Sequence, residues 1–183
     1  MATAGPNSPS TAADDSTVGT AAWSNTGNVT ASDNVYALAS PLNNTQSHYI
    51  KATGFGFAIA GVVNGITVEI ERKYAGGGTT VLDKSIKLVK GGVISGTDKA
   101  ALIGFGTADT YQAYGGVSDL WGLTLTDTDV NASNFGFVYS AVEINGIAVS
   151  VFVDHMRITV TYTAAGGPHL TQTRQAVMRA ATR

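Results

Sequence analysis

The chain has 183 residues, of which 44% are hydrophobic and 13% charged, and its formal net charge is -2. A domain of this size buries about 70% of its unfolded surface, so this composition favours one folded domain over disorder. The absence of Cys excludes disulfides and a Cys-ligated zinc site. The near balance of 11 Lys and Arg against 13 Asp and Glu argues against a general nucleic-acid-binding surface.

Residues 1–20 differ in composition from the rest of the chain. They are rich in Ala, Ser, Thr, Gly and Pro, and Val18 is the only large apolar residue after Met1. Such a stretch cannot bury enough surface to fold alone, so we expect an N-terminal arm. Asp14 and Asp15 stand where a signal peptide would need an apolar run, and no later window has the roughly 20 apolar residues of a spanning helix. We therefore expect synthesis in a cytoplasm and no membrane partner.

Residues 21–163 carry nearly all the aromatic and β-branched residues. Ile66, Val68 and Ile70 alternate with polar residues, which is typical of a strand with one wet face. Other strand-like runs occur at residues 85–90, 135–139, 147–154 and 156–163, and glycine clusters that predict turns occur at 76–78, 91–92 and 115–116. Many short strands without long helices predict an all-β domain, an antiparallel two-sheet sandwich with a jelly-roll-like order.

Residues 126–132 interrupt the strand pattern with Asp127, Asp129 and Asn131. This spacing resembles the opening of a calcium loop, but an EF-hand needs Gly at its sixth position and Glu at its twelfth, where this chain has Ala132 and Val138. Asp and Thr also cap helices. We therefore expect one capped helical turn and no metal site.

The composition changes again at residues 164–183. Apolar residues fall near one face of a predicted short helical tail, and the three Arg of this segment face no acidic residue within it. Residues 1–20 have the opposite charge, with two Asp and no Lys or Arg. The contrast predicts partner contacts through both ends of the chain, at Asp14, Asp15, Leu170, Arg174, Val177, Met178, Arg179 and Arg183.

No catalytic motif is visible. The only histidines, His48, His155 and His169, are scattered, and we interpret them as structural or surface residues, with His155 at a strand start. Glu69 and Glu71 share one face of a strand, as a glycosidase pair would. We favour the interpretation that Glu69 and Glu71 lie on a solvated face, where neighbouring cations balance their charge. These cations are Arg72, Lys73, Lys84 and Lys87.

Four aromatic residues leave two interpretations open. Trp23, Tyr111, Tyr114 and Trp121 are large enough to dominate a core or an interface. The same rings are also suited to stacking on sugars. The glycan or interface candidates are Tyr111, Tyr114 and Trp121.

Several stretches together resemble a known module. They are residues 23–25, 31–37, 49–57, 66–72, 86–92, 119–122, 131–136 and 153–160, among them the runs Asp119-Leu120-Trp121-Gly122 and Asn131-Ala132-Ser133-Asn134-Phe135-Gly136. The series is similar to a β-sandwich module of virion proteins from tailed bacteriophages, over about residues 23–163.

The resemblance implies a non-enzymatic virion structural protein without cofactors. We expect a capsid decoration (cement) protein that binds the major capsid protein or other virion proteins as a homo-oligomer, for example a trimer. A neck, tail or baseplate component is the nearest alternative. Two other classes stay open, a carbohydrate-binding receptor-recognition module at the aromatic candidates and a sandwich glycosidase at Glu69 and Glu71.

Overall fold

The computed structural model describes residues 1–166, which form two six-stranded sheets. Sheet A has the order β10-β6-β12-β4-β3, with β1 also paired to β12; sheet B has the order β2-β5-β11-β7-β8, with β9 also paired to β7. Every pairing between these strands is antiparallel. Their bounds are β1 Ala2–Asn7, β2 Thr11–Asp15, β3 Trp23–Ser24, β4 Ala37–Leu42, β5 Tyr49–Thr53, β6 Gly61–Ala75, β7 Val81–Lys90, β8 Val93–Ser95, β9 Gly104–Phe105, β10 Thr110–Gly115, β11 Gly136–Glu143 and β12 Val149–Ala164.

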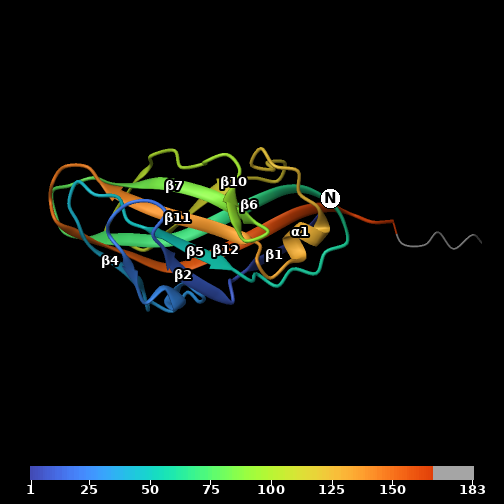
Figure 1. Ribbon diagram of the computed structural model, residues 1–183, viewed down its shortest axis with the longest axis horizontal. Helices are drawn as coiled ribbons and strands as arrows, with labels where there is room; N and C mark the ends of the chain where they lie inside the picture. The colour runs from blue at the N-terminus through green and yellow to red at the C-terminus, as the bar shows by residue number, and fades with distance from the viewer. Residues whose placement is uncertain (167–183) are drawn as a thin grey trace, which may run out of the picture.

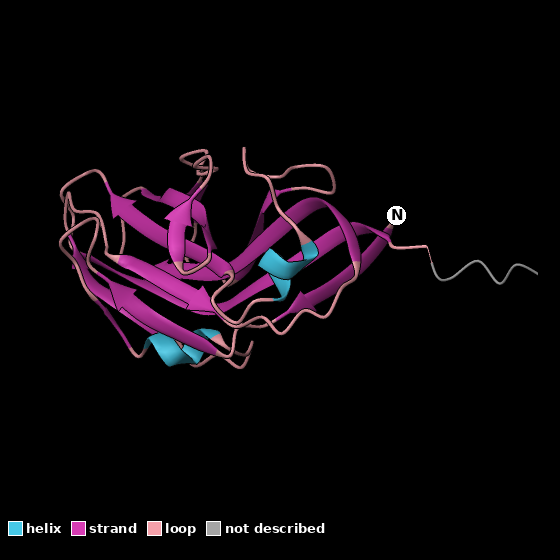
Figure 2. Cartoon of the chain, turned by 45° about the vertical axis from the view of Figure 1, so that its right-hand side comes forward, coloured by secondary structure: helices cyan, strands magenta, loops and turns pink. Residues whose placement is uncertain are grey.

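One hydrophobic core lies between the two sheets. Alternation in β6 turns Ile66, Val68 and Ile70 inward, where they are fully buried among residues of both sheets. Full burial of each such side chain stabilises the fold by about 1.5–3 kcal/mol. Figure 1 shows the long strands β6 and β12 side by side, and Figure 2 shows strands making up most of the body. The predicted all-β, two-sheet architecture is confirmed, while the jelly-roll-like order stays a prediction.

Strand β12 joins two runs that the sequence analysis treated separately. Its apolar alternation changes phase at Asp154, where the register with β6 shifts between Val153 and His155. Such a bulge places one extra residue in the strand and redirects its side chains. His155 therefore lies inside a 16-residue strand, and its predicted place at a strand start is wrong.

Residues 1–20 do not form an arm. β1 pairs with β12 in sheet A and β2 pairs with β5 in sheet B, so the first residues of the chain add a strand to each sheet. This prediction failed because pairing to an existing sheet satisfies the backbone without large side chains. Asp14 accepts hydrogen bonds from the Trp23 backbone N–H and the His48 ring, both at 2.8 Å, and Asp15 binds Thr17. Within residues 1–166, both predicted contact residues therefore have local structural partners.

Two short helical segments complete the described residues, the 3-10 helix η1 (Thr26–Val29) and the α-helix α1 (Asp127–Asn131). Thr126 and Asp129 form a capping box at the start of α1, which confirms the predicted capped turn. Neither segment of residues 1–166 has the length to span a membrane. The predicted helical tail, with Leu170, Arg174, Val177, Met178, Arg179 and Arg183, lies outside the described residues except for 164–166.

Candidate functional site

Two of the three predicted glycan-contact aromatics are core residues. Trp121 is fully buried, and its indole N–H donates to the Ile66 carbonyl at 2.9 Å. Tyr114 is 6% exposed, and its hydroxyl donates to the Asp83 carboxylate. Neither ring is available to stack on a sugar, because their faces pack inside the sandwich. Tyr111 alone of the three is partly exposed.

Arg72 also turns inward, which corrects its assignment to the solvated charged face. It is 2% exposed, and its Nε and Nη2 donate to the two carboxylate oxygens of the fully buried Asp83. The hydroxyls of Tyr114 and Tyr139 donate to the same carboxylate. Burial raises the pKa of Tyr139 well above its ordinary value, and the nearby charge of Asp83 adds to this effect. Position 72 is in phase with Ile66, Val68 and Ile70, and that phase could have revealed its burial from the sequence.

The remaining charged residues of β6 lie on the side of sheet A that points away from the core. We call this side the outer face of sheet A; it carries Tyr36, Glu69, Glu71, Lys73, Tyr111, Phe152, His155 and Arg157. Glu69 pairs with Arg157 in a two-bond contact at 2.9 and 3.0 Å, and the Arg157 guanidinium lies 3.9 Å from the centre of the Tyr111 ring. The balancing cation of Glu69 is therefore on the neighbouring strand β12 and not at Lys84 or Lys87.

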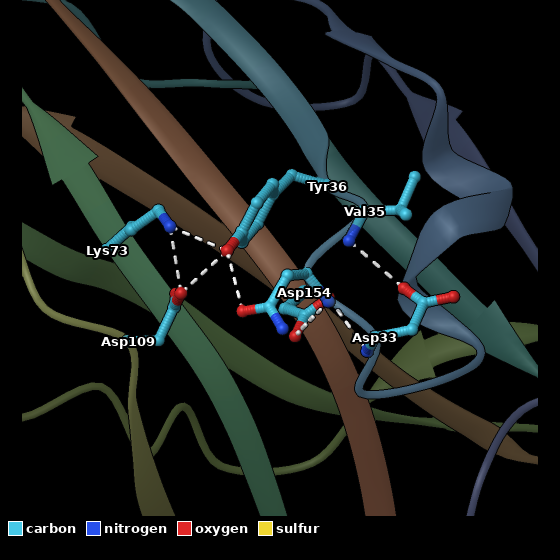
Figure 3. A network of polar contacts seen from close by, with 7 residues as sticks. Asp33, Val35, Tyr36, Lys73, Asp109 and Asp154 are labelled. Atoms are coloured by element: carbon cyan, nitrogen blue, oxygen red, sulfur yellow. Dashed lines mark hydrogen bonds and ion pairs between the residues drawn. The ribbon is translucent and has the colours of Figure 1, made fainter.

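At one end of the outer face, Lys73 joins two loops to the sheet (Figure 3). Its ammonium group donates to the Tyr36 hydroxyl at 2.6 Å and to Asp109 Oδ2 at 2.8 Å. It also lies 4.0 Å from the centre of the Tyr36 ring, which packs edge-on against Phe152. The hydrogen bond to Asp109 is the main reason that the pKa of Lys73 is raised. This contact holds the loop before β4 against the loop before β10.

Asp154, the bulge residue of β12, holds the same loop through a second set of hydrogen bonds (Figure 3). Its carboxylate accepts from the backbone N–H groups of Asp33 at 3.4 Å and Asn34 at 3.2 Å. Desolvation raises the pKa of Asp154, although the two backbone hydrogen bonds act in the opposite direction. Asn34 adopts the left-handed conformation with φ 64°, which its short polar side chain tolerates. These hydrogen bonds could not be predicted from the sequence, because Asn34 and Asp154 are 120 residues apart.

His155 connects three strands of sheet A. Its Nε2 lies 2.8 Å from the Ser8 hydroxyl, just after β1, and its Nδ1 lies 2.8 Å from the Tyr111 hydroxyl on β10. Desolvation, with the nearby charge of Arg157, lowers the pKa of His155 and favours its neutral form. The other described histidine, His48, pairs with Asp14, while His169 lies outside the described residues. The structure thus brings Ser8, Tyr111 and His155 together, a grouping that sequence reasoning missed.

The predicted calcium-like residues support loops in the structure. Asp127 accepts from the Gly61 and Thr128 backbone N–H groups, and these bonds lower its pKa. Asn131 makes two hydrogen bonds to the Ile59 backbone, at 3.0 and 2.8 Å. Among residues 1–166, no three His, Asp or Glu side chains are arranged to hold a metal ion, and no enclosed pocket is found.

Comparison with known proteins adds one structural neighbour. No family model matches the chain, and no curated protein matches it in sequence. The chain is weakly similar in structure to the N-terminal cellulose-binding domain of β-1,4-glucanase C from Cellulomonas fimi, with a TM-score of 0.39 and 6% sequence identity. That alignment covers 85% of this chain and 88% of the other.

Proposed function

We propose that this chain is a non-enzymatic virion structural protein of a tailed bacteriophage, a capsid decoration protein that binds the assembled shell. The observation that carries the proposal is the sequence series over residues 23–163 that resembles a phage virion module. A protein that binds the assembled lattice more tightly than its free subunits stabilises the lattice by mass action. Many symmetry-related copies turn a modest contact into lasting attachment. A neck, tail or baseplate location is the alternative within this class.

The contacts made by the resembling stretches are consistent with a scaffold role. Trp121 ties its loop to β6 through Ile66, and Asp154 ties the loop at Asp33 and Asn34 to β12. The indole N–H of Trp121 and the carboxylate of Asp154 thus hold loops to the sheets. A rigid body of this kind serves a lattice protein, because less conformational entropy is lost when it binds.

Attachment through residues 167–183 is part of the same proposal. The described residues contain 8 of the 11 Lys and Arg and all 13 Asp and Glu, so the body has a formal charge of 8 - 13 = -5 and the segment contributes +3. Basic side chains at Arg174, Arg179 and Arg183 would complement an acidic patch on a neighbouring virion protein. With β1 and β2 built into the sheets, the N-terminal residues no longer support a second attachment arm.

Immunogold labelling of purified intact virions tests the location. Gold on the heads supports capsid decoration, and gold confined to the neck or tail selects the alternative location. Label restricted to the host cytoplasm would contradict the virion proposal. In a second experiment, deletion of residues 167–183 should release the protein from particles without changing its melting temperature. A matched variant in which only Arg174, Arg179 and Arg183 are changed to Ser separates charge from chain length.

A carbohydrate-binding role is a second candidate, and the outer face of sheet A favours it. Tyr111 is partly exposed, and its side chain is held by Arg157 and His155, which makes it a preorganised ring for stacking. Binding on a glycan array that is lost in Tyr111→Ala would support this role. The control is Tyr162→Ala, because Tyr162 is also a partly exposed tyrosine of sheet A but lies on β12, whereas Tyr111 lies on β10. Absence of glycan binding by the intact chain would remove the candidate.

A further inference from the structure

We propose that Ser8 is an activated surface hydroxyl that accepts an acyl group from small activated carboxylic esters, with His155 as its base. Ser8 is exposed, so an acyl donor can reach it, whereas His155 is 7% exposed and shielded from solvent. The Oγ–Nε2 distance of 2.8 Å is within the range for proton transfer to a general base. This inference adds a modification site and is independent of the proposed place in a virion.

The position of Ser8 is fixed on both sides by contacts of the chain. Asn7 pairs with Ile158 at the end of β1, and its side-chain amide donates to the Phe55 carbonyl at 2.9 Å. Two residues after Ser8, the Ser10 backbone N–H donates to the Gly54 carbonyl at 3.0 Å. Ser8 therefore crosses from sheet A to sheet B between two anchored points. An anchored nucleophile loses little entropy when it attacks.

Glu71 decides which nitrogen of His155 carries the proton. It lies opposite both Tyr111 and His155 in the sheet register, and its Oε2 atom is buried without a hydrogen-bond partner among the described residues. The negative charge favours a phenol O–H dipole directed toward Glu71, so the phenol oxygen is left to accept from Nδ1–H of His155. Nε2 is then unprotonated and accepts the proton of Ser8. Desolvation raises the pKa of Tyr111, with Glu71 adding to the effect, so the phenol keeps its proton.

The reaction with p-nitrophenyl acetate illustrates the chemistry. Ser8 Oγ attacks the carbonyl carbon and its proton passes to His155 Nε2; a Ser–acyl bond forms as the bond to p-nitrophenolate breaks. The proton then leaves His155 for solvent, so the products are O-acetyl-Ser8, p-nitrophenolate and one proton. No oxidant or further co-reactant is needed. General-base assistance of this kind contributes about 10²–10⁴-fold to such a rate.

The test treats the full chain with p-nitrophenyl acetate, follows p-nitrophenolate release and locates the acetyl group by peptide mass spectrometry. We expect stoichiometric acetylation at Ser8, loss of the matching phase of p-nitrophenolate release in Ser8→Ala, and a rate reduced about 100-fold or more in His155→Gln. Ser10→Ala is the matched control, since Ser10 is exposed in the same crossing segment, and should react like the unchanged chain. Acetylation confined to lysines, or equal at Ser8 in His155→Gln, would overturn the proposal.

Tyr111 and Glu71 are positioning residues in this arrangement, and a pH profile distinguishes that role from simple structural support. The acetylation rate should rise with pH as His155 loses its proton. His155 is faced by Arg157, which lowers its pKa, and by Glu71, Asp154 and Glu69, which raise it. Glu71→Gln should therefore shift the midpoint of the profile to lower pH. An unshifted midpoint in a folded Glu71→Gln chain would refute the assigned role of Glu71.

Discussion

Replacement of Asp83 by Asn should strongly destabilise the sandwich, because Asp83 is the common acceptor of a buried polar cluster. Its two oxygens accept from Arg72 Nε at 3.1 Å, from Arg72 Nη2, from Tyr114 and from Tyr139 at 2.8 Å. In either orientation, the amide NH₂ of Asn would face two donors, one from Arg72 and one from a tyrosine. It would also leave the Arg72 guanidinium, 2% exposed, without a counter-charge.

Removal of one partner of a buried ion pair costs about 3–5 kcal/mol, because the remaining charge is desolvated and unpaired. For a domain of this size, each kcal/mol shifts the melting temperature by about 2–4 °C, so Asp83→Asn should melt about 6–20 °C lower. Tyr139→Phe removes one hydrogen bond and should cost only about 0.5–1.5 kcal/mol. Thermal and urea unfolding of both variants provide the measurement.

In a Tyr114→Phe/Tyr139→Phe background, where no tyrosine hydroxyl is left without its acceptor, the double variant Asp83→Leu/Arg72→Met separates loss of charge from loss of packing. Because it removes both charges, it should recover most of the stability that Asp83→Asn loses in the same background. A loss below about 1 kcal/mol in Asp83→Asn would show that the buried pair does not carry the energy assigned to it. A double variant no more stable than the single one would equally refute the electrostatic explanation.

Three further predictions concern stability. Trp121→Ala should cost about 3–5 kcal/mol through the cavity it leaves, measured by urea unfolding; a near-neutral change would contradict its assignment to the core. Desolvation would raise the pKa of Glu143, but hydrogen bonds led by the one from the Asn44 backbone lower this pKa to about 2. The ionised Glu143 therefore stabilises the fold fully above about pH 4.5, and this stabilisation is lost as the pH falls through about 2. The stability difference between the unchanged chain and Glu143→Gln should therefore narrow over that pH range, and a constant difference would exclude the linkage. Deletion of residues 1–7 should speed amide hydrogen exchange within residues 160–162, which pair with β1, whereas unchanged exchange there would support a free arm.

The local elements of this protein could be predicted from the sequence. Ile66, Val68 and Ile70 gave the period of a strand, and Thr126 with Asp129 gave a helix cap. These patterns are readable because each depends on residues within a few positions of one another. The same alternation predicts that Arg72 is buried, because position 72 follows Ile66, Val68 and Ile70 at the two-residue spacing of a strand face. The assignment of Arg72 to the solvated face was therefore avoidable.

Other features depended on partners distant in the chain. Residues 2–7 and 11–15 form strands because β12 and β5 offer unpaired backbone groups, although their own composition resembles that of an arm. Ser8 and His155 are 147 residues apart, and Tyr111 and His155 are 44 apart. The sequence by itself determined the strand periods, turns and helix cap, because these arise from short-range spacing. Only the tertiary structure decided which side chains meet across sheet A, because strand order and register cannot be read from any single strand.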